Sequence, residues 1–580
     1  MGAIRISFPD DYHPEDGVWV RNGDTRDLPY SDGDDVEERL ARVVAEAHDL
    51  SVFSADLRPA LRDPPLRYHL TPRRANLLRP FAAALTGRVL EVGAGCGAVT
   101  RYLGELGGRV TAVEGSRRRC AIARSRTRDL PNVAVVWDDA NRFVTAEPFD
   151  AVVMVGVLEY ARVFLGAGQD SPRLFLTHLR GLLREHGMLV LAIENQLGAR
   201  YWAGGAEDHT GFDNFGIQDS YDEASVATFG RHELQEILRG AGLPHQRWYV
   251  PVPDYKMPLA VLSPAGLACN PRFDAAYVLA RHAYHDERRP VHPRFSLERV
   301  WSALQRNRLL LEFANSFLVA AGPAEAFADR LGHGDRLAWS YAVDRHPAYA
   351  NEACVCLEAD GLMIRRRKLA PEAPAPETLL GWRLHDEPYA EGQNWWWRLV
   401  ALLTRPGWTM ADVATWAQWW LAAVLEAAGA ERAPQARLDA RLRLPGRLLD
   451  ATPFNLVATH DGGRRFVNLE WEARGELELG FLVYRALGSS LWQQTSVSWT
   501  GAEPAPTPGA ILARLFAELG LEVGADDVAR YAQLEAHFQA WQAGLPAAAG
   551  VGPAVPAAPP AGPAARPAAT GGKARRPPTR

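Results

Sequence analysis

Cysteine, lysine and long apolar runs are all scarce in this 580-residue chain. Its five cysteines are odd in number and scattered, which argues against a disulfide framework and favours a reducing compartment. Cys354 and Cys356 form a lone C-x-C without partners at metal-ligand spacing, so the sequence predicts no metal site. No apolar run approaches the ~20 residues that span a bilayer, and residues 1–17 contain no apolar signal-peptide core. We therefore expect a cytoplasmic protein, for which peripheral membrane association stays open.

The charge balance excludes one broad class of partner. With 64 basic and 69 acidic side chains and a net charge of −5, the chain gives no reason to expect nucleic-acid binding. Only three of the basic residues are lysines, Lys256, Lys368 and Lys573, which makes each of them worth attention. Residues 545–580 are rich in alanine, proline and glycine and carry basic residues but no acid, so they predict a disordered basic tail.

The length is too great for one ordinary core, so several domains are expected. Between residues 66 and 265, short apolar segments alternate with helical ones, a pattern typical of a Rossmann-like, doubly wound α/β sheet. Residues 1–65 predict an accessory segment that includes a helix. Residues 270–544 predict a helix-rich α+β domain, mostly helical to about residue 340, with a β-hairpin over 353–369.

A strand, a glycine turn and a helix follow one another in V-L-E-V-G-A-G-C-G-A-V-T, residues 89–100. A dinucleotide site would want G-x-G-x-x-G, but here the third glycine comes one residue early. Glu91, two residues before the turn, would repel a pyrophosphate and suits a ligand with an ammonium group. S-adenosylmethionine has that group and has no phosphate.

Two further predicted strands also end in acids. Glu114 ends the second strand, where a carboxylate can accept both ribose hydroxyls, and Asp138 and Asp139 end the third. A carboxylate there could accept the adenine amino group, with Trp137 or Ala140 beside the ring. Because ligands of open α/β sheets bind at the carboxyl ends of the strands, these acids are expected around one ligand.

These motifs resemble those of class I S-adenosylmethionine-dependent methyltransferases, over about 200 residues. Within that family the chain is most similar to methyltransferases of surface-polysaccharide (O-antigen type) biosynthesis, through residues 68–80, 155–161 and 193–211. The resemblance implies S-adenosylmethionine as cofactor, with Tyr68 and His69 closing over it, and is much less specific for the acceptor. The implied cofactor-binding residues are Tyr68, His69, Glu91, Gly93, Ala94, Gly95, Cys96, Gly97, Glu114, Gly115, Asp138, Asp139, Ala140 and Val155.

Candidate general bases follow the fourth and fifth predicted strands. A hydroxyl acceptor needs a base, whereas a phosphate or carboxylate acceptor does not. The candidates are Glu159, Glu194 and the cluster of Glu207, Asp208 and His209. We take His209 first, since flanking acids raise the pKa of an imidazole, and Glu159 second. The alternative is that the loop around His209 only caps the cofactor.

Residues 441–472 resemble the catalytic and metal loops of kinase-like phosphotransferases, which implies ATP and Mg²⁺. Asp450 would orient a hydroxyl, Asn455 and Glu470 would hold the metal, and Lys368 would pair with phosphate. The sequence departs from the family pattern in three ways: no histidine–arginine pair precedes Asp450, Asn-Leu-Glu replaces the usual Asp-Phe-Gly, and residues 340–360 contain no glycine-rich loop. A degenerate kinase-like domain that binds acceptor or partner is therefore an open alternative.

The hypothesis with most support is a methyltransferase acting on a saccharide or sugar-linked acceptor. Two alternatives remain: a bifunctional methyltransferase and kinase that modifies a glycan chain end, and a non-catalytic cofactor-binding scaffold of a glycan assembly complex. The tryptophan run at 395–397 could stack on sugar rings or belong to the core.

Overall fold

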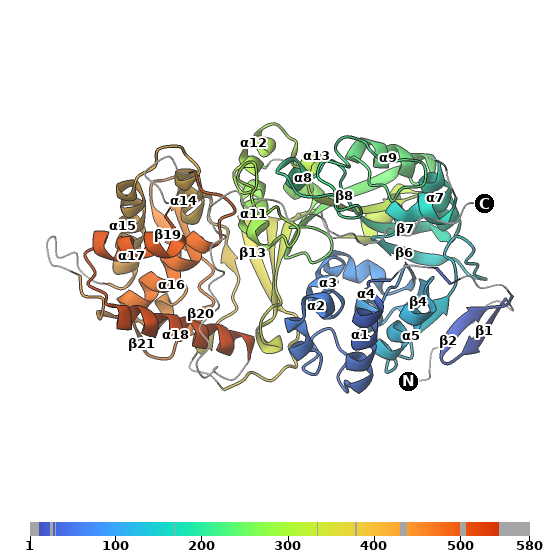
Figure 1. Ribbon diagram of the computed structural model, residues 1–580, viewed down its shortest axis with the longest axis horizontal. Coiled ribbons are helices and arrows are strands. Elements are labelled where there is room, and N and C mark those ends of the chain that lie inside the picture. Colours follow the sequence, from blue (N-terminus) through green and yellow to red (C-terminus); the bar gives the residue numbers. More distant parts are fainter. Residues whose placement is uncertain are drawn as a thin grey trace, which may run out of the picture.

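The structure, a computed structural model, describes residues 11–23, 27–28, 31–166, 168, 170–268, 270–332, 334–377, 380–429, 438–498 and 506–544. The predicted tail at 545–580 lies outside these residues. The molecule is elongated, with a large sheet and its helices at one end and the C-terminal helices α14–α18 at the other (Figure 1). Among the described residues, no helix combines the length and the apolar character needed to cross a membrane.

Five parallel strands form the centre of a 14-stranded sheet and run in the order β5-β4-β3-β6-β7. All five coincide with segments that the sequence predicts as strands, and the predicted α/β class is confirmed. Their apolar β-branched residues suit a strand buried on both faces. The strands are β3 (Arg88–Val92), β4 (Arg109–Glu114), β5 (Val133–Trp137), β6 (Phe149–Val155) and β7 (Leu183–Glu194).

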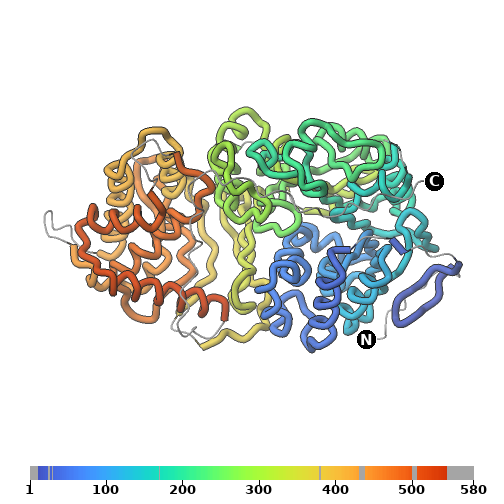
Figure 2. The backbone as a smooth tube through the Cα atoms, in the orientation of Figure 1, coloured from blue at the N-terminus to red at the C-terminus, as the bar shows by residue number. Residues whose placement is uncertain are grey.

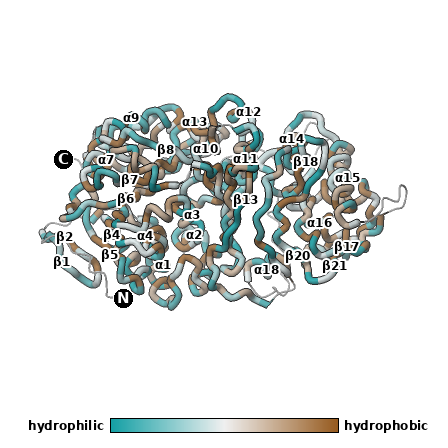
Figure 3. The backbone as a smooth tube through the Cα atoms, turned by 180° about the vertical axis from the view of Figure 1, so that it is seen from behind, coloured by the Kyte–Doolittle hydropathy of each residue, from teal (hydrophilic) through white to brown (hydrophobic). Residues whose placement is uncertain are grey.

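Helices cover both faces of these strands, as a doubly wound sheet requires. Neighbouring residues of β3 face opposite cores: Val89 shares one with Leu103 of α4 (Ala98–Glu105), and Leu90 shares the other with Leu176 of α7 (Ser171–Gly181). The tube in Figure 2 shows α4 and α7 on opposite sides of the strands, and Figure 3 shows hydrophobic residues concentrated along β6 and β7.

The expectation of mostly helical structure at 270–340 is wrong for two segments. Ser316–Gly322 forms strand β10, which lies antiparallel between β7 and β8 (His245–Val252), and Arg336–Ala342 forms β11. All seven residues of β10 are buried. An apolar run of that length carries no periodicity that separates a strand from a buried helix. The sheet therefore continues beyond the boundary expected at residue 265.

The N-terminal segment packs on the edge of the sheet and beside the predicted ligand site. Strands β1 (Tyr12–Glu15) and β2 (Val18–Arg21) form a hairpin whose second strand pairs in parallel with β5. The predicted helix is present as α1 (Asp34–Glu46), and its Leu40 and Val44 share a core with Ile122 of α5 (Arg117–Arg126).

The C-terminal region continues the sheet and then adds a helical body. The predicted hairpin is confirmed as β12 (Asn351–Glu358) and β13 (Gly361–Lys368), which pair antiparallel. Trp395, Trp396 and Trp397 of α14 (Trp395–Leu403) are all buried, in a core shared with β8 and with the remaining C-terminal helices. These rings are therefore core residues. The other helices of the body are α15 (Met410–Ala427), α16 (Leu479–Trp492), α17 (Pro508–Glu518) and α18 (Ala525–Ala543).

Candidate functional site

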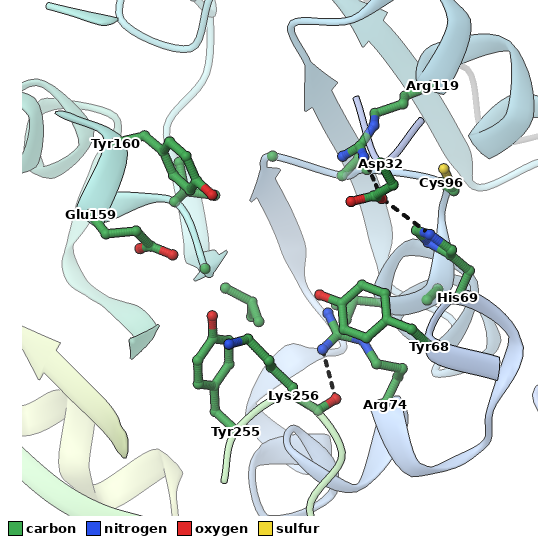
Figure 4. A pocket seen from close by; sticks show the side chains of 18 of the residues that line it. Asp32, Tyr68, His69, Arg74, Cys96, Arg119, Glu159, Tyr160, Tyr255 and Lys256 are labelled. Carbon is green, nitrogen blue, oxygen red and sulfur yellow. Dashed lines mark hydrogen bonds and ion pairs between the residues drawn. The ribbon is translucent and has the colours of Figure 1, made fainter. Parts of the chain in front are cut away.

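A cavity of about 550 Å³ opens at the carboxyl ends of the central strands. It is lined by every predicted cofactor residue except Gly97, and by both predicted catalytic residues, Glu159 and His209. Figure 4 shows its walls: Glu159 and Tyr160 lie on one side, Asp32, His69 and Arg119 on the other, and Tyr255 and Lys256 below. The strand order thus gathers at one edge the residues that the motifs picked out separately.

The glycine turn has a backbone that side chains would disrupt. Gly93, Gly95 and Gly97 have φ of +73°, +53° and +84°, the left-handed region that favours glycine. A Cβ at Gly93 would lie 2.5 Å from Val157 Cγ2, and one at Gly97 would lie 2.9 Å from Ala123 Cα. Gly97 lies behind the turn against α5 and supports it, while Gly93 and Gly95 line the cavity.

Glu91 places a buried carboxylate at the base of the turn. Its side chain is 3% exposed, and Oε2 has no hydrogen-bond partner. Burial raises the pKa of Glu91 to about 8. A buried carboxyl oxygen without a hydrogen bond in a ligand cavity favours a cation, and the ammonium group of S-adenosylmethionine would supply one.

Glu114 fixes the other side of the turn. Its Oε2 accepts the Gly95 N–H at 2.7 Å and its Oε1 accepts the Ser116 N–H at 2.9 Å. Each carboxylate oxygen retains a second lone pair, so the group can still accept ribose hydroxyls. Burial raises the pKa of Glu114 as well.

The two aspartates after β5 differ in their partners. Asp138 is buried and accepts Tyr12 Oη–H at 2.6 Å and Arg21 Nε–H at 2.9 Å, both from the β1–β2 hairpin. Asp139 accepts the backbone and side-chain N–H groups of Asn141, at 2.9 and 2.7 Å. Asp138 therefore ties the hairpin to the sheet, and Asp139 is the better placed of the two for an adenine amino group.

Tyr68 and His69 belong to a wall that includes a residue not predicted from the sequence, Asp32. His69 Nε2 lies 3.1 Å from Asp32 Oδ2, which also pairs with Arg119. Burial alone would raise the pKa of Asp32, but hydrogen bonding from His69 and the charge of Arg119 lower it. The Arg74 guanidinium stacks over the Tyr68 ring at 4.7 Å, which holds that ring at the cavity wall.

The far end of the cavity brings together Glu159, Glu194 and His209. Glu159 follows β6, Glu194 ends β7, and His209 lies in the loop after α8 (Ala199–Trp202), with its Nε2 3.7 Å from Glu194 Oε2. Burial raises the pKa of Glu159 to about 8. Burial alone would lower the pKa of His209, but Glu194 and Glu159 raise it to about 9. The imidazole is therefore protonated near neutral pH. In that form it donates hydrogen bonds, and it must lose its proton before it can act as the predicted general base.

A charged network holds this cluster in place. Lys256 Nζ contacts Glu194 Oε1 at 2.5 Å and Asp208 Oδ2 at 2.8 Å. Burial acts to raise the pKa of Glu194, but Lys256 and His209 hold it well below its usual range. Asp208 also pairs with the buried Arg200 at 2.6 Å. The rarity of lysine was the one sequence signal that marked Lys256.

The predicted phosphotransfer residues lie elsewhere, in the C-terminal region. Lys368 Nζ lies over the Trp382 ring at 5.2 Å. Asp450 is buried, which raises its pKa to about 6, and it accepts the Trp471 N–H at 2.9 Å and lies 3.4 Å from Arg485. Asn455 Nδ2 donates to the Asp450 carbonyl at 2.9 Å.

Glu470 pairs with Arg345 at 2.6 Å and is the one predicted phosphotransfer residue that lines a neighbouring cavity of about 230 Å³. Both predicted acids, Asp450 and Glu470, thus have arginine partners from the same chain. Phosphotransfer by this region stays a prediction.

Residues 90–189 match a family model described as a methyltransferase domain. Among solved structures, N-methyltransferase NodS from Bradyrhizobium japonicum is similar at 21% identity, over 31% of this chain and 85% of that one, with a TM-score of 0.24. A possible histamine N-methyltransferase from Thermotoga maritima is similar at 18% identity, over 46% and 98%, with a TM-score of 0.26. No curated protein sequence matches the chain. The matched residues include the glycine turn, Glu91, Glu114, Asp138, Asp139 and Glu159.

Proposed function

We propose that the chain is an S-adenosylmethionine-dependent methyltransferase that acts in the cytoplasm on a hydroxyl group of a saccharide or sugar-linked acceptor. The observation that carries the proposal is the cavity at the glycine turn, where Glu91 presents a buried, unpartnered carboxylate oxygen and Glu114 and Asp139 line the same wall. A ligand that fits this wall offers a cation at one end and hydroxyl and amino donors along its length.

Each residue of this wall would bind a different group of the cofactor. S-adenosylmethionine, when bound, supplies a methyl group on a positively charged sulfur. Glu91 would pair with the ammonium group, Glu114 would accept ribose hydroxyls, and Asp139 would accept the adenine amino group. Tyr68, held by Arg74, would cover the ligand and exclude water from it.

The acceptor end supports a polar, hydroxyl-bearing substrate. Glu159, His209, Tyr255, Lys256 and Tyr160 all line the cavity there, and each offers a polar or charged group. Such a wall would orient hydroxyls through hydrogen bonds, and Glu159, once ionised above its pKa of about 8, would receive the proton that a hydroxyl must lose.

A thermal-shift experiment on the full chain tests the cofactor assignment, with S-adenosylmethionine, NAD and ATP with Mg²⁺ as separate ligands. Ligand at 100 times its Kd stabilises the native state by about 2.7 kcal/mol, so a clear rise in Tm is expected with S-adenosylmethionine. Glu114→Gln should reduce that rise. A rise with NAD and none with S-adenosylmethionine would overturn the assignment, and a rise with ATP that Asp450→Asn abolishes would support the kinase alternative.

Transfer of a labelled methyl group tests the acceptor class. The protein is incubated with methyl-labelled S-adenosylmethionine and separately with amine-free oligosaccharides and with amine-bearing small molecules, because both similar structures named above are described as N-methyltransferases or possible ones. We expect label in the saccharide arm, and label confined to the amine arm would contradict the proposed acceptor. Cofactor binding without transfer to any acceptor would favour the scaffold alternative.

A further inference from the structure

Three metal-ligating side chains converge at the acceptor end of the cavity. Glu159, Glu194 and His209 each offer one ligand atom, and these atoms all lie within 4.8 Å of one another. Glu159 and Glu194 are 1% and 0% exposed, and the His209 side chain is 12% exposed. Three different segments of the chain supply them, so the convergence is a property of the fold and not of a local turn.

Three buried atoms of this cluster make no hydrogen bond. They are Glu159 Oε2, Glu194 Oε2 and His209 Nε2, of which the last two lie 3.7 Å apart as an ion pair. Burying such groups without compensation costs stability, by several kcal/mol for a charge. The unsatisfied atoms therefore indicate a missing partner that contacts all three.

The opposite atoms of His209 and Glu194 are anchored. Tyr160 Oη lies 3.2 Å from His209 Nδ1, while Tyr255 Oη–H and Lys256 Nζ contact Glu194 Oε1 at 3.0 and 2.5 Å. Metal-binding histidines and carboxylates are held in this way, with one atom on the ion and the other on an outer partner. These anchors leave His209 Nε2 and Glu194 Oε2 available to a common ligand.

A divalent cation fits this cluster better than the nearby lysine. Lys256 already contacts the far oxygen of Glu194 and Asp208, whereas a divalent cation can contact all three side chains and takes the histidine and both carboxyls in their deprotonated forms. A cation about 2.0–2.2 Å from each ligand needs neighbouring ligand atoms no more than ~4.2 Å apart. The 3.7 Å between His209 Nε2 and Glu194 Oε2 lies within this limit, and since the three ligand atoms lie within 4.8 Å of one another, the Glu159 carboxylate would have to approach the ion by a few tenths of an ångström at most.

We propose that Glu159, Glu194 and His209 bind a divalent cation of the Mn²⁺ or Zn²⁺ class, which holds the acceptor oxygen beside the methyl-donor site. One imidazole and two carboxylates suit these ions. Glu159 and His209 line the same cavity as the glycine turn, so an open coordination position would face the acceptor. That role rests on the proposed methyltransferase function, whereas cation binding does not.

Mn²⁺ binding to the full chain tests the site without any methyl transfer. Electron paramagnetic resonance titration should show one tightly bound Mn²⁺ per chain, and electron spin-echo spectra should show coupling to one imidazole nitrogen. Glu159→Gln and His209→Gln should each weaken binding more than about 100-fold, because losing even an outer partner costs 10–100-fold. Glu298→Gln, which alters a buried acid outside the cavity and outside this cluster, is the matched control and should bind as the unaltered chain does.

The outcomes separate this inference from the proposed function. No Mn²⁺ binding, no nitrogen coupling, or equal binding by the Glu159 variant would overturn the cation site, while the thermal shift with S-adenosylmethionine could still support the methyltransferase. Site-dependent Mn²⁺ binding without any shift by S-adenosylmethionine would support the cation site and contradict the proposed function. The nitrogen coupling is measured on the unaltered chain, so the test stands even if a variant fails to fold.

Discussion

Glu91 makes cofactor binding depend on pH in a way that can be worked out from its environment. Burial raises the pKa of this carboxyl to about 8, so most of the ligand-free protein holds it neutral at pH 7. An ammonium group pairs with the ionised form, and the proton must leave before or during binding. Affinity for S-adenosylmethionine should therefore rise with pH up to about 8. A site that bound the ligand through a protonated, cationic side chain would instead lose affinity as the pH rises.

The size of the effect follows from the ionised fraction. With a pKa of about 8, that fraction falls from about 25% at pH 7.5 to about 0.3% at pH 5.5. Kd should then increase roughly 80-fold over this interval, which corresponds to ~2.6 kcal/mol at about 1.36 kcal/mol per pH unit. Below pH 7.5 an α-amino group of ordinary pKa, about 7.7–8.0, stays mostly protonated, so the ligand contributes little to the slope.

Isothermal titration calorimetry in buffers of different ionisation enthalpy measures both Kd and the protons released. Glu91→Gln is the control, because it keeps the size of the side chain. It also leaves Glu114 unchanged, and the raised pKa of Glu114 makes affinity increase with pH in both proteins. We expect nearly one proton fewer released by the variant at pH 6.5 and a slope lower by almost one log unit per pH unit. Equal slopes for the two proteins would refute the assignment of Glu91 to the ammonium group.

Three further experiments with substituted proteins test other parts of the structure. Gly97→Ala should lower the free energy of unfolding, measured with urea, more than Gly95→Ala does. Both substitutions add ~1–2 kcal/mol of left-handed backbone strain, but of the two new Cβ atoms only the one at Gly97 meets backbone, 2.9 Å from Ala123 Cα. Equal losses of stability would contradict the packing of Gly97 against α5. Arg200→Met should cost about 3–5 kcal/mol, because it leaves Asp208, Asp254 and Asp286 buried without their shared guanidinium. Loss of the guanidinium should raise the folded-state pKa values of Asp208 and Asp286, so the deficit should grow as pH rises from 5 to 8, and a pH-independent deficit would argue against this cause. Trp396→Ala should lower the stability, measured by thermal unfolding, by about 3–5 kcal/mol, because the side chain is fully buried in the core. Trp419 is 43% exposed, so Trp419→Ala should cost less. A similar loss for both variants would contradict the assignment of the tryptophan run to the core.

The cofactor wall could be predicted because its residues occupy fixed positions in a repeated unit. Glu91, Glu114 and Asp139 lie at the ends of successive parallel strands, and the carboxyl ends of such strands meet at one edge. Alternating apolar runs and glycine spacing specify the strands and the turn locally. The sequence was equally informative for the hairpin of β12 and β13, where an Asp-Gly pair separates two runs of alternating residues.

The rest of the site depends on contacts that no local pattern encodes. Asp32 reaches the cavity from the N-terminal segment by pairing with His69 and Arg119, and Lys256 reaches it from the connection after β8. Strand β10 was missed for a related reason, since its seven buried residues carry no period of 2 or 3.6. Even His209 was found by its flanking acids, whereas the residue that most affects its proton is Glu194, which only the fold brings within 3.7 Å.

Both ends of the cavity contain a buried carboxyl oxygen that makes no hydrogen bond. At the cofactor end Glu91 Oε2 is buried without a partner, and at the acceptor end Glu159 Oε2 and Glu194 Oε2 are buried likewise, although Lys256 and Arg200 lie close by. Burial raises the pKa of Glu91 and of Glu159 to about 8, so near neutral pH each holds a proton that a bound cation would displace. Binding of a cation at either end would return stability to the native state, by an amount that grows with ligand concentration over Kd. Because Glu91 lies at the cofactor end and Glu159 at the acceptor end, a cation bound at one end would not displace the proton at the other.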